Sequence, residues 1–457
     1  MHINRFKSLI FTFCVGVSTS LLGQGSSGQN FIRSPYTNYG LGEWMHTNLA
    51  QAGTAQHTYG GFFSHSLSNP ATLGNTRYTV FDFGGNYRNG NTTQGDQVND
   101  FQGGSIDYLS LAMPIWKYVD QKLLRYDTAK DQKYWKYTPY GATTAVALRP
   151  LSSMGYTYYI DNNVGLPTRT AYLGSGGVNM LQWNTGVRLG NSVNLGYGMG
   201  YVFGTTRDNA VFTVIDSFGL GAVEDAQSMV LRGMQQQVGV LFEHKIDSTY
   251  HRLGFSYEWY SGVEANTNRL AQSMEIIGGA TRVLDTIINE QGVTKSISMP
   301  ASFGVGYSFR YRRSIMLALD WRTQLWSQYK GMNNTDVFRD RNDYSVTLFI
   351  NPMDLKAPNE KKMKVPVRLS YGLSESQIMV QQGADLYGLQ EQRYGLGFGI
   401  PIIRRYFDNS VLTNVIQINV QYMTRATKGG NFPREQFITV GVGVQLGDIW
   451  FAKRKYD

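Results

Sequence analysis

Charged residues are scarce in this chain of 457 residues: they make up 16%, against about a quarter in soluble domains. No apolar run of about 18 residues follows the N-terminus, which argues against membrane-spanning helices. The chain contains one cysteine, Cys14, so disulfides do not hold a fold together. Lysine and arginine are scattered, apart from a short run at 453–455, and this distribution argues against nucleic-acid binding.

The first residues have the pattern of a secretory signal. Arg5 and Lys7 form a positive start, the stretch 8–22 is apolar, and small Gly23 offers a cleavage site. A buried first strand or helix is the alternative. Cys14 follows Phe13, which does not fit a lipoprotein box. We therefore expect 1–23 to be a signal peptide. An exported chain without cysteine is typical of proteins of the Gram-negative cell outer membrane, and we expect the chain to be located there.

Glycine (51 residues) and tyrosine (30 residues) are abundant, and they alternate with large apolar side chains. In 192–204 (SVNLGYGMGYVFG) the odd positions are large, whereas the even positions include Gly196, Gly198 and Gly200. A strict period of two over about ten residues, repeated many times, predicts a transmembrane antiparallel β-barrel. A soluble sandwich would carry Lys and Glu on its outer face, and it remains the alternative together with a soluble β-helix.

We count about fourteen such strands, an even number as a single-chain bacterial barrel requires. The expected strands are 78–89, 103–114, 141–153, 171–190, 192–206, 234–247, 250–261, 297–311, 314–327, 342–351, 365–375, 391–403, 411–425 and 436–450.

The connections between these strands are expected to be short on the periplasmic side and long on the outer side. Tight periplasmic turns fall at 191, 247–249 and 311–313. Long outer loops fall at 207–233, 262–296, 328–341, 376–390 and 426–435. Two charged connections, 115–140 and 352–364, are too long for this scheme. They are either periplasmic excursions or a sign that the strand count is wrong by two.

Residues 25–77 are rich in Gly, Ser, Asn and Thr and lack the strand pattern. Irregular backbone cannot cross lipid unpaired, so this stretch either hangs in the periplasm or enters the lumen. The glycine-bearing inner face favours an N-terminal lumen plug. We thus divide the chain into a signal peptide (1–23), a plug or hatch (24–77) and a barrel (78–457).

Several stretches resemble the FadL-like outer-membrane transport proteins, which carry long-chain fatty acids or aromatic hydrocarbons. The stretch 68–73 (SNPATL) resembles the Asn-Pro-Ala element of that family's hatch, and 297–329 resembles a pair of its strands. The stretches 368–378 and 393–400 resemble two later strands, and SPYTNYGLGE with the terminal WFAKRKYD resembles a Bacteroidetes-type branch. The resemblance implies fourteen strands, a lumen hatch and a small hydrophobic ligand.

The mature chain offers little for catalysis. His57 and His65 have no cluster of acids or cysteines beside them, and no strand-centred histidine could serve a hydrolase. We expect no enzymatic activity, no metal and no cofactor. Aromatic residues at strand ends are expected to form interfacial girdles: Tyr87, Trp116, Trp183, Trp259, Trp321, Trp326, Trp450 and Tyr456.

Five charged residues are expected to point into the lumen: Glu258, Arg310, Asp320, Arg322 and Arg368. They either form a polar path or latch for the hatch, or neutralise one another in a wet lumen. The candidate binding residues, on the plug and lumen wall, are Asn69, Pro70, Ala71, Arg310, Asp320 and Arg322.

The favoured function is an outer-membrane channel for small hydrophobic, fatty-acid-like molecules, gated by the plug. The alternative is a scaffold or partner of a secretion or surface complex, as type IX-associated barrels are, with 115–140 and 262–296 as docking surfaces. Expected partners are membrane lipids, lipopolysaccharide, a small hydrophobic ligand and other outer-membrane or secretion-system proteins, but not nucleic acid.

Overall fold

A computed structural model describes most of the chain. The described residues are 34–45, 55–116, 119–127, 132–137, 140–162, 166–216, 219–277, 280–312, 314–331, 337–350, 365–405 and 411–448. The expected signal peptide, Trp450, Tyr456 and the connection 352–364 lie outside these ranges. Among the described residues, no helix is both long and apolar enough to cross a bilayer.

Fourteen antiparallel strands form a closed ring within the described residues, because β6 pairs with β7 as well as with β3. The ring strands are β2 (Thr79–Gln94), β3 (Gln97–Trp116), β6 (Gly141–Asn162), β7 (Thr168–Leu189), β8 (Val193–Asp216), β9 (Gly219–Ile246), β10 (Thr249–Ile277), β12 (Ser302–Tyr311), β13 (Ile315–Gln324), β14 (Arg341–Ile350), β15 (Val367–Gln382), β16 (Asp385–Arg405), β17 (Val411–Thr427) and β18 (Arg434–Asp448). The predicted transmembrane β-barrel of fourteen strands is confirmed.

The alternation in the sequence becomes an inside and an outside of this barrel. Along β8, Leu195, Tyr197 and Tyr201 are 43–47% exposed on the outer face, whereas Asn194 and Val202, which flank this stretch, are fully buried. Large apolar side chains are exposed in the same way on the other strands of the ring. Together they form a continuous apolar belt around the barrel. Such a belt matches hydrocarbon, as a membrane-spanning barrel requires.

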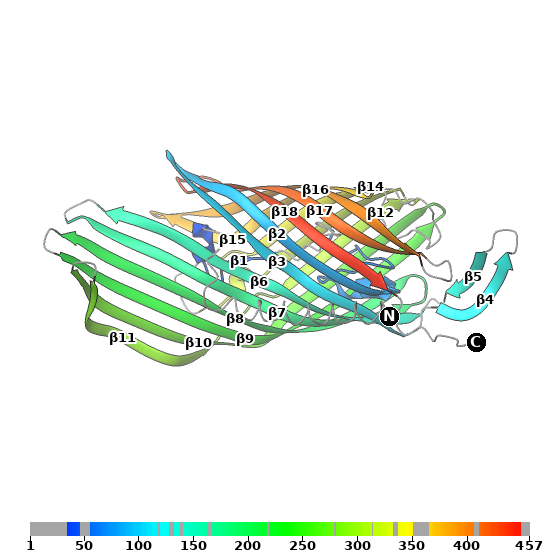
Figure 1. The fold of residues 1–457 in the computed structure, drawn as a ribbon, viewed down its shortest axis with the longest axis horizontal. Helices are drawn as coiled ribbons and strands as arrows, with labels where there is room; N and C mark the ends of the chain where they lie inside the picture. The colour runs from blue at the N-terminus through cyan, green and yellow to red at the C-terminus, as the bar shows by residue number, and fades with distance from the viewer. Residues whose placement is uncertain are drawn as a thin grey trace.

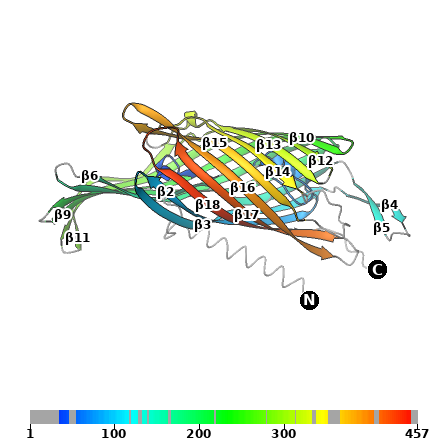
Figure 2. The same ribbon diagram turned by 90° about the horizontal axis from the view of Figure 1, so that it is seen from above.

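The two ends of the barrel differ in how far their strands extend, while both ends contain connections of two residues. At one end, here called the short-turn end, β7–β8, β9–β10 and β12–β13 are joined by two or three residues, as predicted. Asp247 and Arg312 adopt the left-handed conformation in two of these turns. The opposite end, here called the projecting end, extends β8, β9 and β10 to 24, 28 and 29 residues, whereas β12–β14 have ten each (Figures 1 and 2).

The prediction of long outer loops at 207–233 and 262–296 is therefore wrong. Paired strand continues through most of both stretches, and a further strand, β11 (Ala280–Ser296), pairs with the outer half of β10. Clear of lipid, both strand faces are solvated, so the apolar alternation stops while the ladder of backbone hydrogen bonds goes on. A span of the bilayer needs only about 9–11 residues, and these strands are far longer.

The charged connection at 115–140 folds in part as a separate two-stranded sheet of β4 (Val119–Asp127) and β5 (Gln132–Tyr137). It lies beyond the short-turn end (Figures 1 and 2). This hairpin does not enter the ring, so the count of fourteen stands, and the long connection is an excursion.

Two stretches ahead of β2 lie inside the barrel. The first luminal segment (34–45) contains η2 (Pro35–Asn38) and β1 (Glu43–Trp44), and the second luminal segment (55–78) contains η3 (Pro70–Asn75). Leu41 and Trp44 pack into an apolar cluster with wall residues that include Leu151 and Met180. Trp326, in η4 (Trp326–Gln328), belongs to this cluster and is 1% exposed. Its expected place in an interfacial girdle is thus wrong.

The ladder between β3 and β6 covers only part of these strands. Pairing runs from Trp116–Ala142 to Leu109–Leu148, and beyond that pair the described residues of β3 (97–108) and β6 (149–162) do not pair with each other. On β6, residues 152 and 153 pair instead with the two residues of β1. The wall is therefore split toward the projecting end, with β1 covering a short part of the β6 edge.

Candidate functional site

Glycines on the inner face of β7, β8 and β9 form a floor for the second luminal segment. Gly186, Gly196 and Gly239 lie opposite one another in register across these three strands. A Cβ atom at Gly196 would lie 2.2 Å from the backbone nitrogen of Ala71. One at Gly239 would lie 2.1 Å from Asn69 Oδ1. On these strands the inner face lacks side chains because the second luminal segment packs directly against the strand backbone there.

The same floor continues onto β10 and β12. Gly254 and Gly306 are paired in register, and Cβ atoms there would meet His57 O at 2.2 Å and His57 Cβ at 2.8 Å. A Cβ at Gly304 would overlap the His57 ring, 1.9 Å from Nε2. Larger residues at these positions would exclude the second luminal segment, so the floor and the segment fit as a pair.

Polar wall side chains hold the backbone of the second luminal segment. Gln237 donates to Leu67 O at 3.1 Å, and Thr143 donates to Thr76 O at 2.8 Å. Arg252 donates to Gly60 O at 2.5 Å. Irregular backbone buried in a barrel needs such partners, since each unpaired buried group costs about 1–3 kcal/mol. The wall therefore supplies the hydrogen bonds that secondary structure would otherwise supply.

Asp320 of β13 binds the start of this segment. Its Oδ1 accepts the backbone N–H of His57 at 2.9 Å and lies 2.8 Å from His57 Nδ1. Asn69 caps η3 by accepting from Ala71 N, and its amide donates to His57 O at 2.8 Å. His57 is thus the point where the wall and the Asn-Pro-Ala turn meet.

His65 has a different environment. It is 2% exposed, its Nε2 lies 2.9 Å from Ser110 Oγ, and its Nδ1 is buried without a partner among the described residues. Burial lowers the pKa of the His65 imidazole to about 4. This side chain is therefore neutral at physiological pH and packs between segment and wall.

Glu43 of β1 ties the first luminal segment to a buried ionic network. Its carboxylate contacts Arg88 at 3.0 Å and Arg425 at 2.7 Å. Burial by itself would raise the pKa of Glu43, but these two guanidinium groups outweigh burial and lower that pKa to about 2. Arg425 in turn contacts Glu391 at 3.1 Å and Glu435 at 3.0 Å.

The network extends across β14 and β16 and is balanced in charge. Arg341 contacts Glu391 at 3.0 Å and Asp343 at 3.2 Å, and Arg393 lies 3.7 Å from Asp343. Together with Arg88, Arg425, Glu43 and Glu435, it contains four arginines and four carboxylates. Removing any one member would leave an uncompensated buried charge, which is costly.

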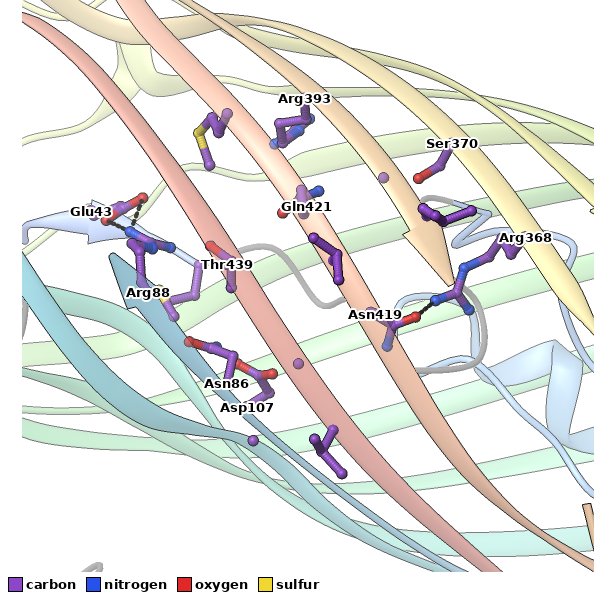
Figure 3. Close-up of a pocket in the computed structure, with 18 of the residues that line it drawn as sticks. Glu43, Asn86, Arg88, Asp107, Arg368, Ser370, Arg393, Asn419, Gln421 and Thr439 are labelled. Atoms are coloured by element: carbon purple, nitrogen blue, oxygen red, sulfur yellow. Dashed lines mark hydrogen bonds and ion pairs between the residues drawn. The ribbon is translucent and has the colours of Figure 1, made fainter. Parts of the chain in front are cut away.

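A cavity lies beside this network, between the first luminal segment and the wall strands β2, β3 and β15–β18 (Figure 3). It encloses about 950 Å³ of empty space, open solvent at its mouth included. Its lining mixes polar residues such as Asn86 and Gln421 with apolar ones such as Trp44 and Met423, and it includes Gly441. At Gly441 the wall leaves room, since a Cβ atom there would meet nothing closer than 3.7 Å.

The cavity lies next to the split in the wall. Asp107, one of its lining residues, precedes the last β3–β6 pair by two positions. It is skipped in the pairing of β2 with β3, where Gly84 pairs with Tyr108 and Gly85 with Ile106. This bulge turns the Asp107 side chain inward, where its carboxylate accepts a hydrogen bond from Asn86.

The structure buries all five predicted inward charges. It pairs Arg322 with Glu258 at 3.0 Å, and it joins Asp320 to the second luminal segment. Asn69, Pro70 and Ala71 are buried on the glycine floor. None of the six predicted binding residues lines the cavity described above, so their role in binding a ligand stays a prediction.

Sequence analysis missed the residues that build the cavity and the network. Glu43 and Arg425 are 382 positions apart, and Asp107 owes its inward direction to a bulge. The inward positions of Asn86, Arg393 and Asn419 follow from the alternation once the strands are placed. Groups of three or more potential metal ligands do not occur among the described residues.

Comparison with solved structures gives the same fold. The structure is similar to the P. putida toluene transporter TodX, with a TM-score of 0.52, 13% identity, and coverage of 88% of this chain and 97% of TodX. It is also similar to a Pseudomonas aeruginosa FadL homologue, with a TM-score of 0.51, 11% identity, and coverage of 88% and 99%. The predicted likeness to FadL-type proteins is confirmed for the fold.

No curated protein matches the chain. A family model described as BamG matches residues 6–120 and 138–457, which is nearly the whole sequence. This family is distinct from the FadL-type channels that share the fold. The chain belongs to the BamG family.

Proposed function

We propose that this chain is an outer-membrane barrel that passes small hydrophobic molecules sideways through its wall. The observation that carries this proposal is the split between β3 and β6, which lies next to the luminal cavity. An apolar solute gains free energy on leaving water for hydrocarbon, so a route into the bilayer suits it better than a watery pore. The short-turn end would face the periplasm.

The two luminal segments would gate this route. They bury Leu41, Trp44 and His57 against the inner wall, so a ligand that crosses the lumen requires them to move. The predicted binding residues on the plug and wall would contact the ligand during that movement. The toluene transporter and the FadL homologue of the same fold support this proposal by analogy.

The experiment compares uptake of toluene and decanoate into liposomes with and without the folded protein. The barrel contains no cysteine, which allows cysteine pairs to be placed freely. Continuing the β3–β6 register would place cysteines at positions 105 and 152 opposite each other across the split, where position 152 pairs with Trp44 of β1, so a long bismaleimide is used to span this gap. Bridging them with a bismaleimide is expected to abolish uptake.

A pair at positions 111 and 146, which are already partners in the ladder, is the matched control and should leave uptake unchanged after bridging. Uptake that persists after the 105–152 bridge would rule out the lateral route. Liposomes with protein that take up neither solute faster than empty ones would rule out transport itself.

A scaffold for a surface or secretion complex is the second candidate, and β11 favours it. One edge of β11 has no strand partner among the described residues, and Val283, Leu284 and Ile287 are 49–57% exposed. Exposed edges with apolar residues are typical of protein contacts. Replacing these three residues with lysine should remove co-purifying proteins from native membranes, whereas Val98→Lys, equally exposed on β3, should not. Neither candidate assigns catalysis to the chain.

A further inference from the structure

The luminal cavity contains one arginine that the ionic network does not use. Arg368 of β15 lines the cavity and is 8% exposed. Three other arginines around the cavity, Arg88, Arg393 and Arg425, each contact carboxylates. Arg368 has no ion pair among the described residues and donates one hydrogen bond, to Asn419 Oδ1. A guanidinium group has five N–H donors, so most of its capacity is open.

Among the residues that the structure describes, none supplies a negative charge to Arg368. The ionisable groups that interact electrostatically with Arg368 are the phenols of Tyr59 and Tyr108, and both phenols are uncharged at neutral pH. A buried cation without a counter-ion is costly, and ionisable residues inside membrane-spanning proteins commonly face a water-filled cavity and mark functional sites. The free charge therefore points to a partner that enters from the cavity.

The remaining lining can complete the binding of such a partner. Ser370, Asn419, Gln421 and Thr439 place hydroxyl and amide groups along the same space (Figure 3). Hydroxyl and amide N–H groups donate to oxyanions, and guanidinium groups bind carboxylate and phosphate oxygens in pairs. Gly441 leaves room beside these groups, because a Cβ atom there would meet nothing closer than 3.7 Å.

The negative residues of the cavity do not oppose this assignment. Glu43 is neutralised by Arg88 and Arg425. Asp107 and its partner Asn86 lie at the opposite end of the cavity from Arg368 (Figure 3). A small anionic group at the Arg368 end thus avoids both carboxylates.

We propose that this cavity is an oxyanion-binding site in which Arg368 is the charged residue and Asn419 positions its guanidinium. The ligand is a carboxylate or a phosphate group, either as a free anion or as the head of an amphipathic molecule. The proposal goes beyond transport, because a site of this kind binds its anion whether or not the wall lets a solute pass.

The test is calorimetric titration of the full-length protein, folded in a non-ionic detergent at constant chloride, with acetate, inorganic phosphate and decanoate. Wild-type protein is expected to bind at least one of them. Binding of acetate or phosphate as tightly as decanoate identifies a free anion, and binding of decanoate alone identifies an amphiphile head group. No heat of binding with any of the three overturns the proposal.

Two variants test the charge of Arg368: one removes it and the other neutralises it. Arg368→Gln should weaken binding roughly ten- to hundredfold, as expected for the loss of charged hydrogen bonds worth about 1.5–3 kcal/mol. Asn419→Asp keeps the shape of the site but gives Arg368 an internal counter-ion, and it should weaken binding as strongly even if Arg368→Gln misfolds. Arg169→Gln, at an exposed ion pair outside the cavity, is the matched control and should bind like wild type. Unchanged affinity in Asn419→Asp would overturn the assignment.

Discussion

The imidazole Nδ1 of His57 lies 2.8 Å from Oδ1 of Asp320, and the same oxygen accepts the backbone N–H of His57. These residues are 263 positions apart and join the second luminal segment to the middle of β13. Both side chains are almost fully buried. One carboxylate oxygen of Asp320 thus contacts both the main chain and the ring of His57. The amide of Asn69 binds the carbonyl oxygen of the same residue.

We expect Asp320→Ala to loosen the second luminal segment without opening the barrel. Loss of a charged hydrogen-bond acceptor that serves two buried donors should lower the local opening free energy by about 1.5–3 kcal/mol. Hydrogen exchange at residues 55–75 should then be roughly ten- to hundredfold faster, while exchange in the strands stays unchanged. Asp161→Ala, in an exposed pair with Arg169, is the control. Equal protection in both variants would contradict this role for Asp320.

A second prediction concerns the glycine floor. Gly196→Ala would place a Cβ 2.2 Å from Ala71 N, so either the segment or the strand has to shift. We expect a destabilisation of about 1–3 kcal/mol, typical of overpacking, and faster exchange at residues 69–73. Gly221→Ala is the matched control on β9, because nothing lies within 4 Å of its new methyl group. That change should be neutral or slightly stabilising, since it removes glycine's extra entropy in the unfolded chain.

The ring of strands follows from the sequence because lipid imposes one simple rule on each strand. Outward positions such as Leu195 and Tyr197 must be apolar, and the period of two marks every crossing. Tight turns at 247–248 and 312–314 were predictable for the same reason, since the alternation stops and resumes within a few residues. This rule does not apply to strands that lie outside lipid, so the sequence pattern did not predict β11.

The alternation of apolar residues does not predict which side chains interact with one another inside the lumen. It marks Asp320 and Arg368 as inward but does not distinguish the residue that is paired with His57 from the one left without a counter-ion. Those partners depend on how the luminal segments pack and on which strands close the ring. The bulge at Asp107 similarly depends on the register of β2 against β3.

A third prediction follows from Glu43. Burial raises the pKa of its carboxyl group and Glu391 adds to that, but the attraction of Arg88 and Arg425 outweighs both and lowers the pKa to about 2 from an ordinary value of 4.5. The native state therefore binds fewer protons than the unfolded state between these values. The stabilisation, on the order of 3 kcal/mol, is present above pH 4.5 and is lost as the pH falls to about 2.

Fluorescence of Trp44 can report this change, because Trp44 is adjacent to Glu43 and packs edge-on against Trp326 at 5.3 Å. In the wild type, the signal of the packed state should disappear as the pH falls from 4.5 toward 2. Glu43→Gln should be destabilised at neutral pH and lack that dependence. Glu375→Gln, at an exposed pair with Lys428, should behave like wild type. An acid transition that is the same in all three proteins would exclude Glu43 as its source.

The last prediction concerns His65 and a separate pH window. Burial lowers the pKa of His65 to about 4 from an ordinary value of 6.5, so the unfolded chain takes up a proton that the native state excludes. Stability therefore falls as the pH drops from 6.5 to 4, by about 3 kcal/mol in total, and this contribution is constant below pH 4.

The variant His65→Gln tests this prediction, because glutamine does not titrate and its amide can still form a hydrogen bond with Ser110. Urea unfolding at pH 7 and pH 5 should show a smaller loss of stability for this variant than for wild type. His251→Gln, at the short-turn end and half-exposed, should lose as much as wild type does. A pH effect of equal size in His65→Gln and wild type would mean that His65 is already accessible to protons in the native state.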